Sequence, residues 1–111
     1  MTKELIPQSL LAKLPKLSET EGEIYENLMC QVKLFSPIGI GTWYIIEYDL
    51  EEDLAFGYVD LGYPGLTYFS LKELKEIDLP YGLKIERDRS WKPKPLAKVE
   101  KAHKALYELS L

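Results

Sequence analysis

The stretch "TWYIIEYDLEEDLAFGYVD", Thr42–Asp60, contains two strand-like runs separated by an acidic turn. In "TWYIIEYD", apolar residues fall on both faces, which is typical of a central strand covered on two sides. In "LAFGYVD", Leu54, Phe56 and Tyr58 share one face, whereas Gly57 on the other permits a bulge or a close backbone approach. The acids of "LEED" suit an exposed turn, so the stretch predicts an antiparallel hairpin at the centre of a sheet.

Further strands are expected on both sides of this hairpin. "CQVKLFS" alternates apolar and polar residues, and Pro37–Gly41 turns the chain after it. "YPGL" is a β-turn signature, and "TYFS" after it fits a short strand. "LKIERD" fits either a short edge strand or an extended connector. Short connections between sequential strands favour an antiparallel meander of three to four strands.

Three helices are predicted around this sheet. The first covers Thr2–Leu14, with Thr2 as its cap and Pro15 at its end. The second is "SLKELKEI", where Ser70 and Glu73 fit a capping box. The third follows Pro95 and covers Leu96–Leu111. We therefore expect one α+β domain over residues 1–111, with a core over 1–95 and a C-terminal helix over 96–111.

The composition excludes several classes of site. A net charge of -4 argues against a general nucleic-acid binder. Cys30 and His103 are the only residues of their types, which excludes an internal disulfide and a Cys/His zinc site within one chain. We expect Cys30 to be buried, and His103 to lie near a helix C-terminus, where a positive charge is favourable.

Targeting signals and catalytic motifs are not visible in the sequence. The early charges predict no signal peptide, and no apolar run approaches the roughly 20 residues of a membrane span, so we expect a cytoplasmic protein without membrane contact. A nucleophile elbow, a Walker loop and a dinucleotide fingerprint are not found. Glu47, Asp60 and Glu86 lie near strand ends, and a sheet that gathered them would offer a metal or acid–base site. A metal-dependent enzyme is thus one alternative, although we expect no enzyme, no metal and no cofactor.

The connector "KIERDRSWKPKP", Lys84–Pro95, concentrates charge. In an extended conformation, Glu86 and Asp88 point to one side and Arg87 and Arg89 to the other.

Two structural roles are predicted for this connector. Arg87 is expected to form a bidentate ion pair with Glu47 or Asp60 and so attach the connector to the sheet, in preference to binding a ligand. The set of candidate structural ion-pair residues is Glu47, Asp60, Glu86, Arg87 and Asp88. An arginine beside Trp91 would stack on its ring.

Cations and aromatic rings make the last third of the chain a candidate binding surface. The candidate binding residues are Trp43, Tyr68, Arg87, Arg89, Trp91, Lys92 and Lys94. Cations for phosphate and rings for stacking are the components of a single-strand nucleic-acid site. The alternatives are a solvated lysine-rich surface and, for Trp43, a half-buried position in the sheet.

Several segments, in this order, resemble one bacterial family. They are "VKLFSP" at Val32–Pro37, "TWYIIEYD" at Thr42–Asp49, "FGYVD" at Phe56–Asp60, "YFSLKEL" at Tyr68–Leu74 and "IERD" at Ile85–Asp88. The family is known as domain of unknown function 2958, and its members are similar to accessory proteins of plasmids and other mobile elements.

The resemblance by itself implies almost nothing about activity. The mobile-element context and the absence of a catalytic signature together favour a small non-catalytic interaction protein that binds and modulates a host macromolecular machine, such as a defence system. The partner would be a host or element-encoded protein, with single-stranded nucleic acid as the alternative. The oligomeric state is left open.

Overall fold

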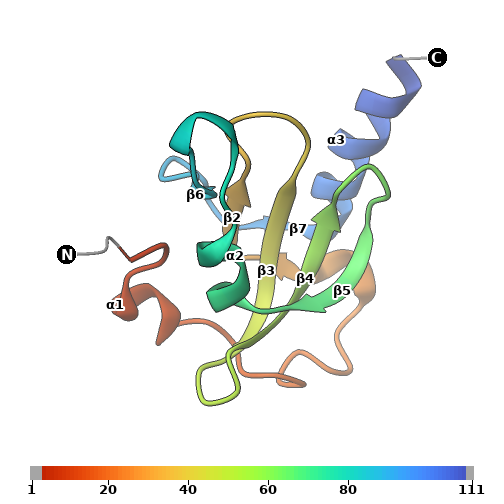
Figure 1. The fold of residues 1–111 in the computed structure, drawn as a ribbon. Helices are drawn as coiled ribbons and strands as arrows, with labels where there is room; N and C mark the ends of the chain where they lie inside the picture. Colours follow the sequence, from red (N-terminus) through yellow and green to blue (C-terminus); the bar gives the residue numbers. More distant parts are fainter. Residues whose placement is uncertain (1–3, 110–111) are drawn as a thin grey trace.

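The computed structural model describes residues 4–109 and has an α+β fold built on a five-stranded antiparallel sheet (Figure 1). The strands of this sheet are β2 (Val32–Phe35), β3 (Thr42–Asp49), β4 (Leu54–Asp60), β5 (Gly65–Phe69) and β6 (Glu86–Arg87). Their spatial order is β5-β4-β3-β2-β6, so β2 to β5 form a meander and β6 returns to the other side of β2. The expected meander is confirmed, but three to four strands were too few. The fifth strand is β6, where the sequence left a short edge strand and an extended connector as alternatives, and the structure shows the edge strand.

The central hairpin has the predicted form. Thr42 pairs with Asp60 and Asp49 with Leu54, and the register shifts between Ile45 and Glu47. A Cβ atom built on Gly57 would lie 1.7 Å from the Tyr44 carbonyl oxygen. The glycine is therefore required by a close backbone approach beside a β-bulge, as the sequence indicates.

The sheet is covered on both faces. On one face, α1 (Gln8–Leu11) and α2 (Leu71–Glu76) lie over a core that includes Leu34, Ile45 and Leu74. On the other face, α3 (Leu96–Leu109) packs its Leu96 and Val99 side chains against residues of β3 and β4. Strand β3 is buried on both sides, which confirms its predicted central position.

The three helices differ from expectation mainly at the N-terminus. Helix α1 is a single turn, Gln8–Leu11, and not the predicted Thr2–Leu14, because Pro7 before it is extended, with a ψ of 145°. Pro7 also disfavours helical backbone at Ile6, the residue before it. The predicted Thr2 cap lies outside the described residues. Helix α2 begins after Ser70, whose side chain accepts a hydrogen bond from the Glu73 N–H, as predicted. Asp53 in the β3–β4 turn adds a second cap, accepting from the N–H groups of Leu71 and Lys72.

A second, two-stranded sheet ties α3 to the rest of the chain. Strands β1 (Met29–Cys30) and β7 (Lys94–Pro95) are antiparallel, and the Leu96 N–H donates to the Leu28 carbonyl at 2.7 Å. Cys30 is fully buried, as expected. Short 3-10 turns cover Tyr25–Asn27 (η1) and Pro80–Gly82 (η2). Within residues 4–109, no helix has the length and apolar character needed to cross a membrane.

Candidate functional site

The three carboxylates proposed as a metal site are not gathered together. In the antiparallel β3–β4 pair, Asp60 lies opposite Thr42 at the start of β3, whereas Glu47 lies near the end of β3. Glu86 is exposed on the edge strand β6. Neighbouring antiparallel strands run in opposite directions, so two residues that each lie near the end of a strand can lie at opposite ends of the sheet. Among residues 4–109, no group of three His, Cys, Asp or Glu side chains is arranged to hold a metal ion.

Glu47 instead holds the N-terminal loop. Its carboxylate accepts hydrogen bonds from the backbone N–H groups of Ser18 and Thr20, each at 2.9 Å, and from the Thr20 hydroxyl. Glu47 is only 5% exposed, and these donors replace the water that burial removes. Its contacts are therefore those of a structural residue.

A chain of buried hydrogen bonds connects α3 to the sheet through His103. The His103 Nδ1 lies 2.7 Å from Asp60 Oδ2, and its Nε2 lies 2.8 Å from the Tyr44 hydroxyl. An ionised carboxylate only accepts, so Nδ1 carries the proton and, in the neutral ring, Nε2 accepts from Tyr44. Asp60 Oδ1 also accepts from the Gly62 N–H at 2.9 Å and from the Tyr107 hydroxyl at 2.6 Å.

The Asp60–His103–Tyr44 chain has the order of a catalytic relay but is closed to substrates. All three residues are at most 6% exposed. Burial raises the pKa of the Tyr44 hydroxyl, so it stays protonated near neutral pH. Burial opposes ionisation of Asp60, yet the hydrogen bonds from Tyr107, Gly62 and His103 outweigh it and hold the pKa of this carboxyl below its usual range.

The position of His103 corrects the sequence prediction. It lies in the middle of α3 and faces the sheet, rather than compensating the charge of a helix terminus. Its spacing from Leu96 and Val99 is the signal that was available, because residues three or four apart share one helix face.

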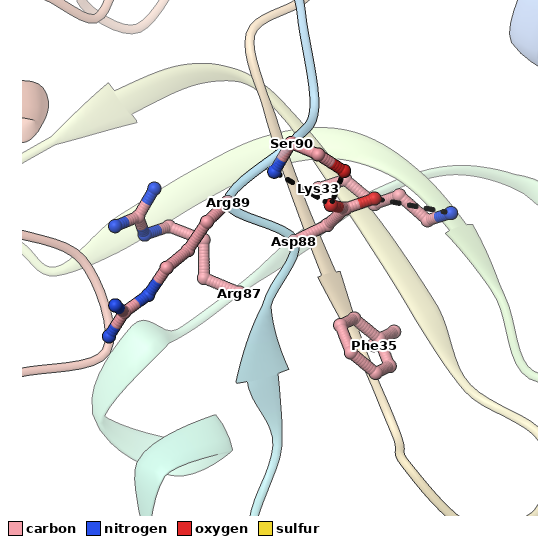
Figure 2. Close-up of a pocket in the computed structure, with 6 residues that line it drawn as sticks. All are labelled: Lys33, Phe35, Arg87, Asp88, Arg89 and Ser90. Atoms are coloured by element: carbon pink, nitrogen blue, oxygen red, sulfur yellow. Dashed lines mark hydrogen bonds and ion pairs between the residues drawn. The ribbon is translucent and has the colours of Figure 1, made fainter.

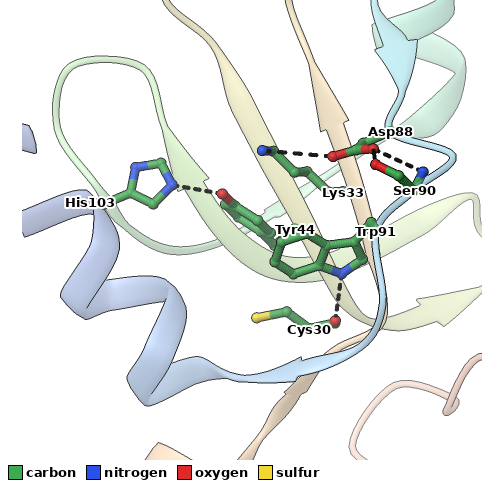
Figure 3. A network of polar contacts seen from close by, with 7 residues as sticks. All are labelled: Cys30, Lys33, Tyr44, Asp88, Ser90, Trp91 and His103. Carbon is green, nitrogen blue, oxygen red and sulfur yellow. Dashed lines mark hydrogen bonds and ion pairs between the residues drawn. The ribbon is translucent and has the colours of Figure 1, made fainter.

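Trp91 folds back onto the sheet beside this chain (Figure 3). Its ring lies 5.2 Å from the Tyr44 ring, and its Nε1–H donates to the Cys30 carbonyl at 3.0 Å. The cations over the Trp91 ring are Lys94 at 4.5 Å and Lys33 at 5.7 Å. The expected arginine stack is thus replaced by lysines, and the indole is engaged within the fold.

Two hollows flank the connector that follows β6. The first, of about 470 Å³, is lined by Lys33, Phe35, Arg87, Asp88, Arg89 and Ser90 (Figure 2). The second, of about 350 Å³, is lined by Leu10, Lys13, Leu14, Gln31, Val32, Arg87, Asp88, Trp91 and Pro93. Residues Arg87 and Asp88 line both hollows, so a cationic and an anionic side chain separate them.

The charges of the connector are arranged as its alternation predicts. Figure 2 shows Arg87 and Arg89 extending to the side opposite Asp88. Asp88 accepts hydrogen bonds from the Ser90 hydroxyl at 2.7 Å and from the Ser90 N–H at 3.0 Å, and it lies 3.9 Å from Lys33 Nζ. The hydrogen bonds from Ser90 are the main cause that lowers the pKa of the Asp88 carboxyl. Asp88 therefore has its own partners and leaves the two arginines to the opposite side.

The predicted ion pair of Arg87 was wrong. Within residues 4–109, the lysine–carboxylate ion pairs are Lys33–Asp88 and Lys84–Asp78, and Asp60 is bonded to His103, so Arg87 meets neither Glu47 nor Asp60. Arg87 pairs with Leu34 across the edge of the sheet, whereas the two acids lie on interior strands and have other partners. Its guanidinium is thus free to contact another molecule.

The remaining candidate binding residues are dispersed. Trp43 is 6% exposed and packs in the core under α1 and α2. Tyr68 is exposed on β5, with its ring 5.1 Å from that of Phe56. Lys92 and Lys94 are exposed on the connector. Of the predicted set, only Arg87 and Arg89 line the first hollow, and Arg87 and Trp91 line the second.

Comparison with known proteins gives one match. A family described as "Protein of unknown function (DUF2958)" matches residues 5–105. No curated protein and no solved structure matches the chain.

Proposed function

The chain belongs to the DUF2958 family, and we propose that it is a non-catalytic interaction protein that binds an acidic segment of another protein. The observation that carries this proposal is the first hollow, where Arg87 and Arg89 point away from Asp88 without an ion pair to any residue in 4–109. The partner's acidic segment would supply the missing carboxylates.

The chemistry of the hollow suits a carboxylate-bearing peptide. Arginine donates paired hydrogen bonds to a carboxylate in a fixed planar geometry. Phe35 is half-buried and lies on the Asp88 side of the connector (Figure 2), so it offers an apolar contact only to a partner that also reaches that side of the sheet edge. The chain as a whole carries a net charge of -4, so a local cationic site would steer an acidic segment to this edge of the sheet.

A protein partner fits these features better than single-stranded nucleic acid. Stacking of bases requires exposed rings, but one side of Trp91 meets Tyr44 and Lys94 lies over the ring.

A catalytic role is the weaker proposal for the same chain. The polar relay through His103 is buried, and in residues 4–109 every fully buried side-chain nitrogen or oxygen has a hydrogen-bond partner. The similarity to proteins of mobile elements favours a partner in a host machine, and inhibition of a defence system is one such role. We include that context in the proposal.

The test compares capture of host proteins by matched variants. The unmodified chain, Arg87→Glu/Arg89→Glu and the control Lys72→Glu/Lys75→Glu are immobilised and exposed to host lysate. Both variants change the charge equally, but the control residues are exposed on α2 and line neither hollow. We expect one protein to be retained by the unmodified chain and the control and to be lost with the arginine variant.

A direct measurement then separates the classes of partner. A synthetic peptide from an acidic segment of the captured protein, and a fluorescent single-stranded oligonucleotide, are titrated in parallel by anisotropy. Arginine-dependent binding of the peptide supports the proposal. Capture that survives the arginine variant, or arginine-dependent binding of the oligonucleotide alone, would overturn it.

A further inference from the structure

The two edges of the five-stranded sheet are built differently. Edge strand β6 has only two residues, Glu86 and Arg87, and both are charged. Edge strand β5 has five residues, Gly65–Phe69, none of which is charged. The uncharged stretch extends from Leu61 to Leu71, in a chain in which 29% of residues are charged. Short length and charged side chains hinder pairing with a further strand, and of the two edges only β6 has them.

The outer side of β5 offers an unused set of backbone groups. Its residues pair with β4 from Ala55↔Phe69 to Val59↔Gly65, and β5 is the last strand of the sheet on that side (Figure 1). Apart from this pairing with β4, no backbone hydrogen bond joins β5 to another segment in the described part of the chain. Alternate N–H and C=O groups of an edge strand point outward, so β5 presents a template for another strand.

Native edge strands usually carry a device against such pairing. Charged side chains, an internal proline, a bulge or very short length are the common ones. Strand β5 has none of these, since its pairing with β4 is regular and Pro64 lies before its first residue. Its surroundings are also apolar, with Tyr63 93% exposed and Tyr68 59% exposed. An edge of this composition is expected to be covered.

We propose that β5 pairs antiparallel with β5 of a second copy, forming a dimer with one continuous sheet. An antiparallel pair of identical strands obeys two-fold symmetry, so the same donors and acceptors serve both copies. Thr67, the middle residue of β5, lies near the symmetry axis and faces its counterpart.

Charge favours a second copy at this edge in particular. Each chain carries -4 and repels its copy over most approaches, but the Leu61–Leu71 stretch contributes no charge to the contact. Buried Tyr side chains contribute roughly 150–250 Å² each, so Tyr63 and Tyr68 of both copies supply about half of the ~1,200 Å² of a small stable interface. The backbone ladder and Leu61 add to this area.

The dimer would leave the Arg87 hollows accessible, because β6 is at the opposite edge of the sheet. Its existence does not depend on the proposed function. The dimer is tested by the mass of the chain in solution, and the proposed function is tested by capture from lysate. Either proposal can therefore fail without affecting the other.

The test is the mass of the chain in solution, measured by light scattering and sedimentation over a range of concentrations. We expect twice the chain mass of 12.8 kDa at high concentration and dissociation on dilution. Thr67→Lys places two like charges across the symmetry axis and should raise the dimer dissociation constant at least about tenfold. The control Ser9→Lys adds the same charge at an exposed position of α1 and should leave the mass unchanged.

A second variant guards against misfolding of the first. Tyr63→Ser alters an exposed side chain outside the strand, so it should weaken the dimer while the circular dichroism spectrum stays that of the unmodified chain. A single-chain mass at every concentration would overturn the proposal. A dimer that Thr67→Lys and Tyr63→Ser leave unchanged would overturn it equally, because its contact would lie elsewhere.

Discussion

Replacing Asp60 should uncouple α3 from the sheet. In Asp60→Ala, the Gly62 N–H, the His103 Nδ1–H and the Tyr107 hydroxyl lose their acceptor, and only His103 among these residues is buried. A buried donor without a partner costs about 1–3 kcal/mol and a lost hydrogen bond at half-buried Gly62 about 1 kcal/mol, so we expect a loss of about 2–4 kcal/mol of unfolding free energy. This is a large share of the about 5–15 kcal/mol that stabilises a domain.

Asp60→Asn should cost less, because the network has a second arrangement. The asparagine oxygen still accepts from Gly62 and Tyr107, and its NH₂ group then faces His103 Nδ1. If His103 moves its proton to Nε2, Nδ1 accepts from the asparagine and the Tyr44 hydroxyl accepts from Nε2. We expect a loss of roughly 1–2 kcal/mol, the value of weakened rather than missing hydrogen bonds.

The unmodified chain and Asp60→Asn should differ in how their free energy of unfolding depends on pH. The pKa of Asp60 is held below its usual range in the folded state, so the unfolded chain takes up the proton first as the pH falls. The contribution of Asp60 is therefore complete above the unfolded pKa of about 3.9 and is lost as the pH falls through the folded pKa. The stability difference between the unmodified chain and Asp60→Asn should be full near about pH 5 and narrow below about pH 4.

Urea unfolding followed by circular dichroism measures all of these quantities. A cost below about 1 kcal/mol for Asp60→Ala, the net value of one ordinary hydrogen bond, would show that Asp60 does not hold α3 on the sheet. An Asp60→Asn variant as damaging as Asp60→Ala would show that the alternative proton arrangement does not exist.

Three further outcomes are expected. Gly57→Ala places a Cβ atom 1.7 Å from a backbone oxygen, so it should cost at least about 3 kcal/mol in urea unfolding, and a loss below about 1 kcal/mol would contradict the close approach. Glu47→Ala leaves the N–H groups of Ser18 and Thr20 without their acceptor and should cost about 1–3 kcal/mol and speed proteolysis of the Lys16–Glu23 loop, whereas unchanged cleavage would show that the loop is held otherwise. Burial raises the pKa of Cys30 to about 12, so its thiol should resist a thiol reagent near neutral pH until urea is added, and rapid labelling of the folded chain would contradict its burial.

The sequence predicted the parts of the fold that depend on local pattern. The central hairpin, the bulge position at Gly57 and the Ser70 cap each follow from a short run of residues with a clear physical signature. The α3 helix is observed as Leu96–Leu109, within the predicted Leu96–Leu111, and its last two predicted residues lie outside the described part.

The parts that were missed depend on contacts between distant segments. Asp60 and His103 are 43 residues apart, and only the packing of α3 on β4 brings them together. The Arg87 ion pair was wrongly predicted for the same reason. The alternation of "IERD" shows which side chains share a side, but it does not show which strand β6 pairs with. Asp53 read as a turn residue, and its second role as a cap of α2 required the fold.

The β1–β7 ladder has a consequence for the order of events in folding. It joins Met29 to Pro95 and places α3 over a face formed by residues such as Tyr44, Ile46 and Tyr58. Helix α3 is synthesised after all five strands of the main sheet. Until residues 96–103 arrive, that face lacks the side chains of α3, whereas α1 and α2 are already available to the opposite face. Exposed apolar surface and unpaired strands make such intermediates prone to aggregation. The nascent chain is thus most vulnerable in the interval between completion of the sheet and docking of its last helix.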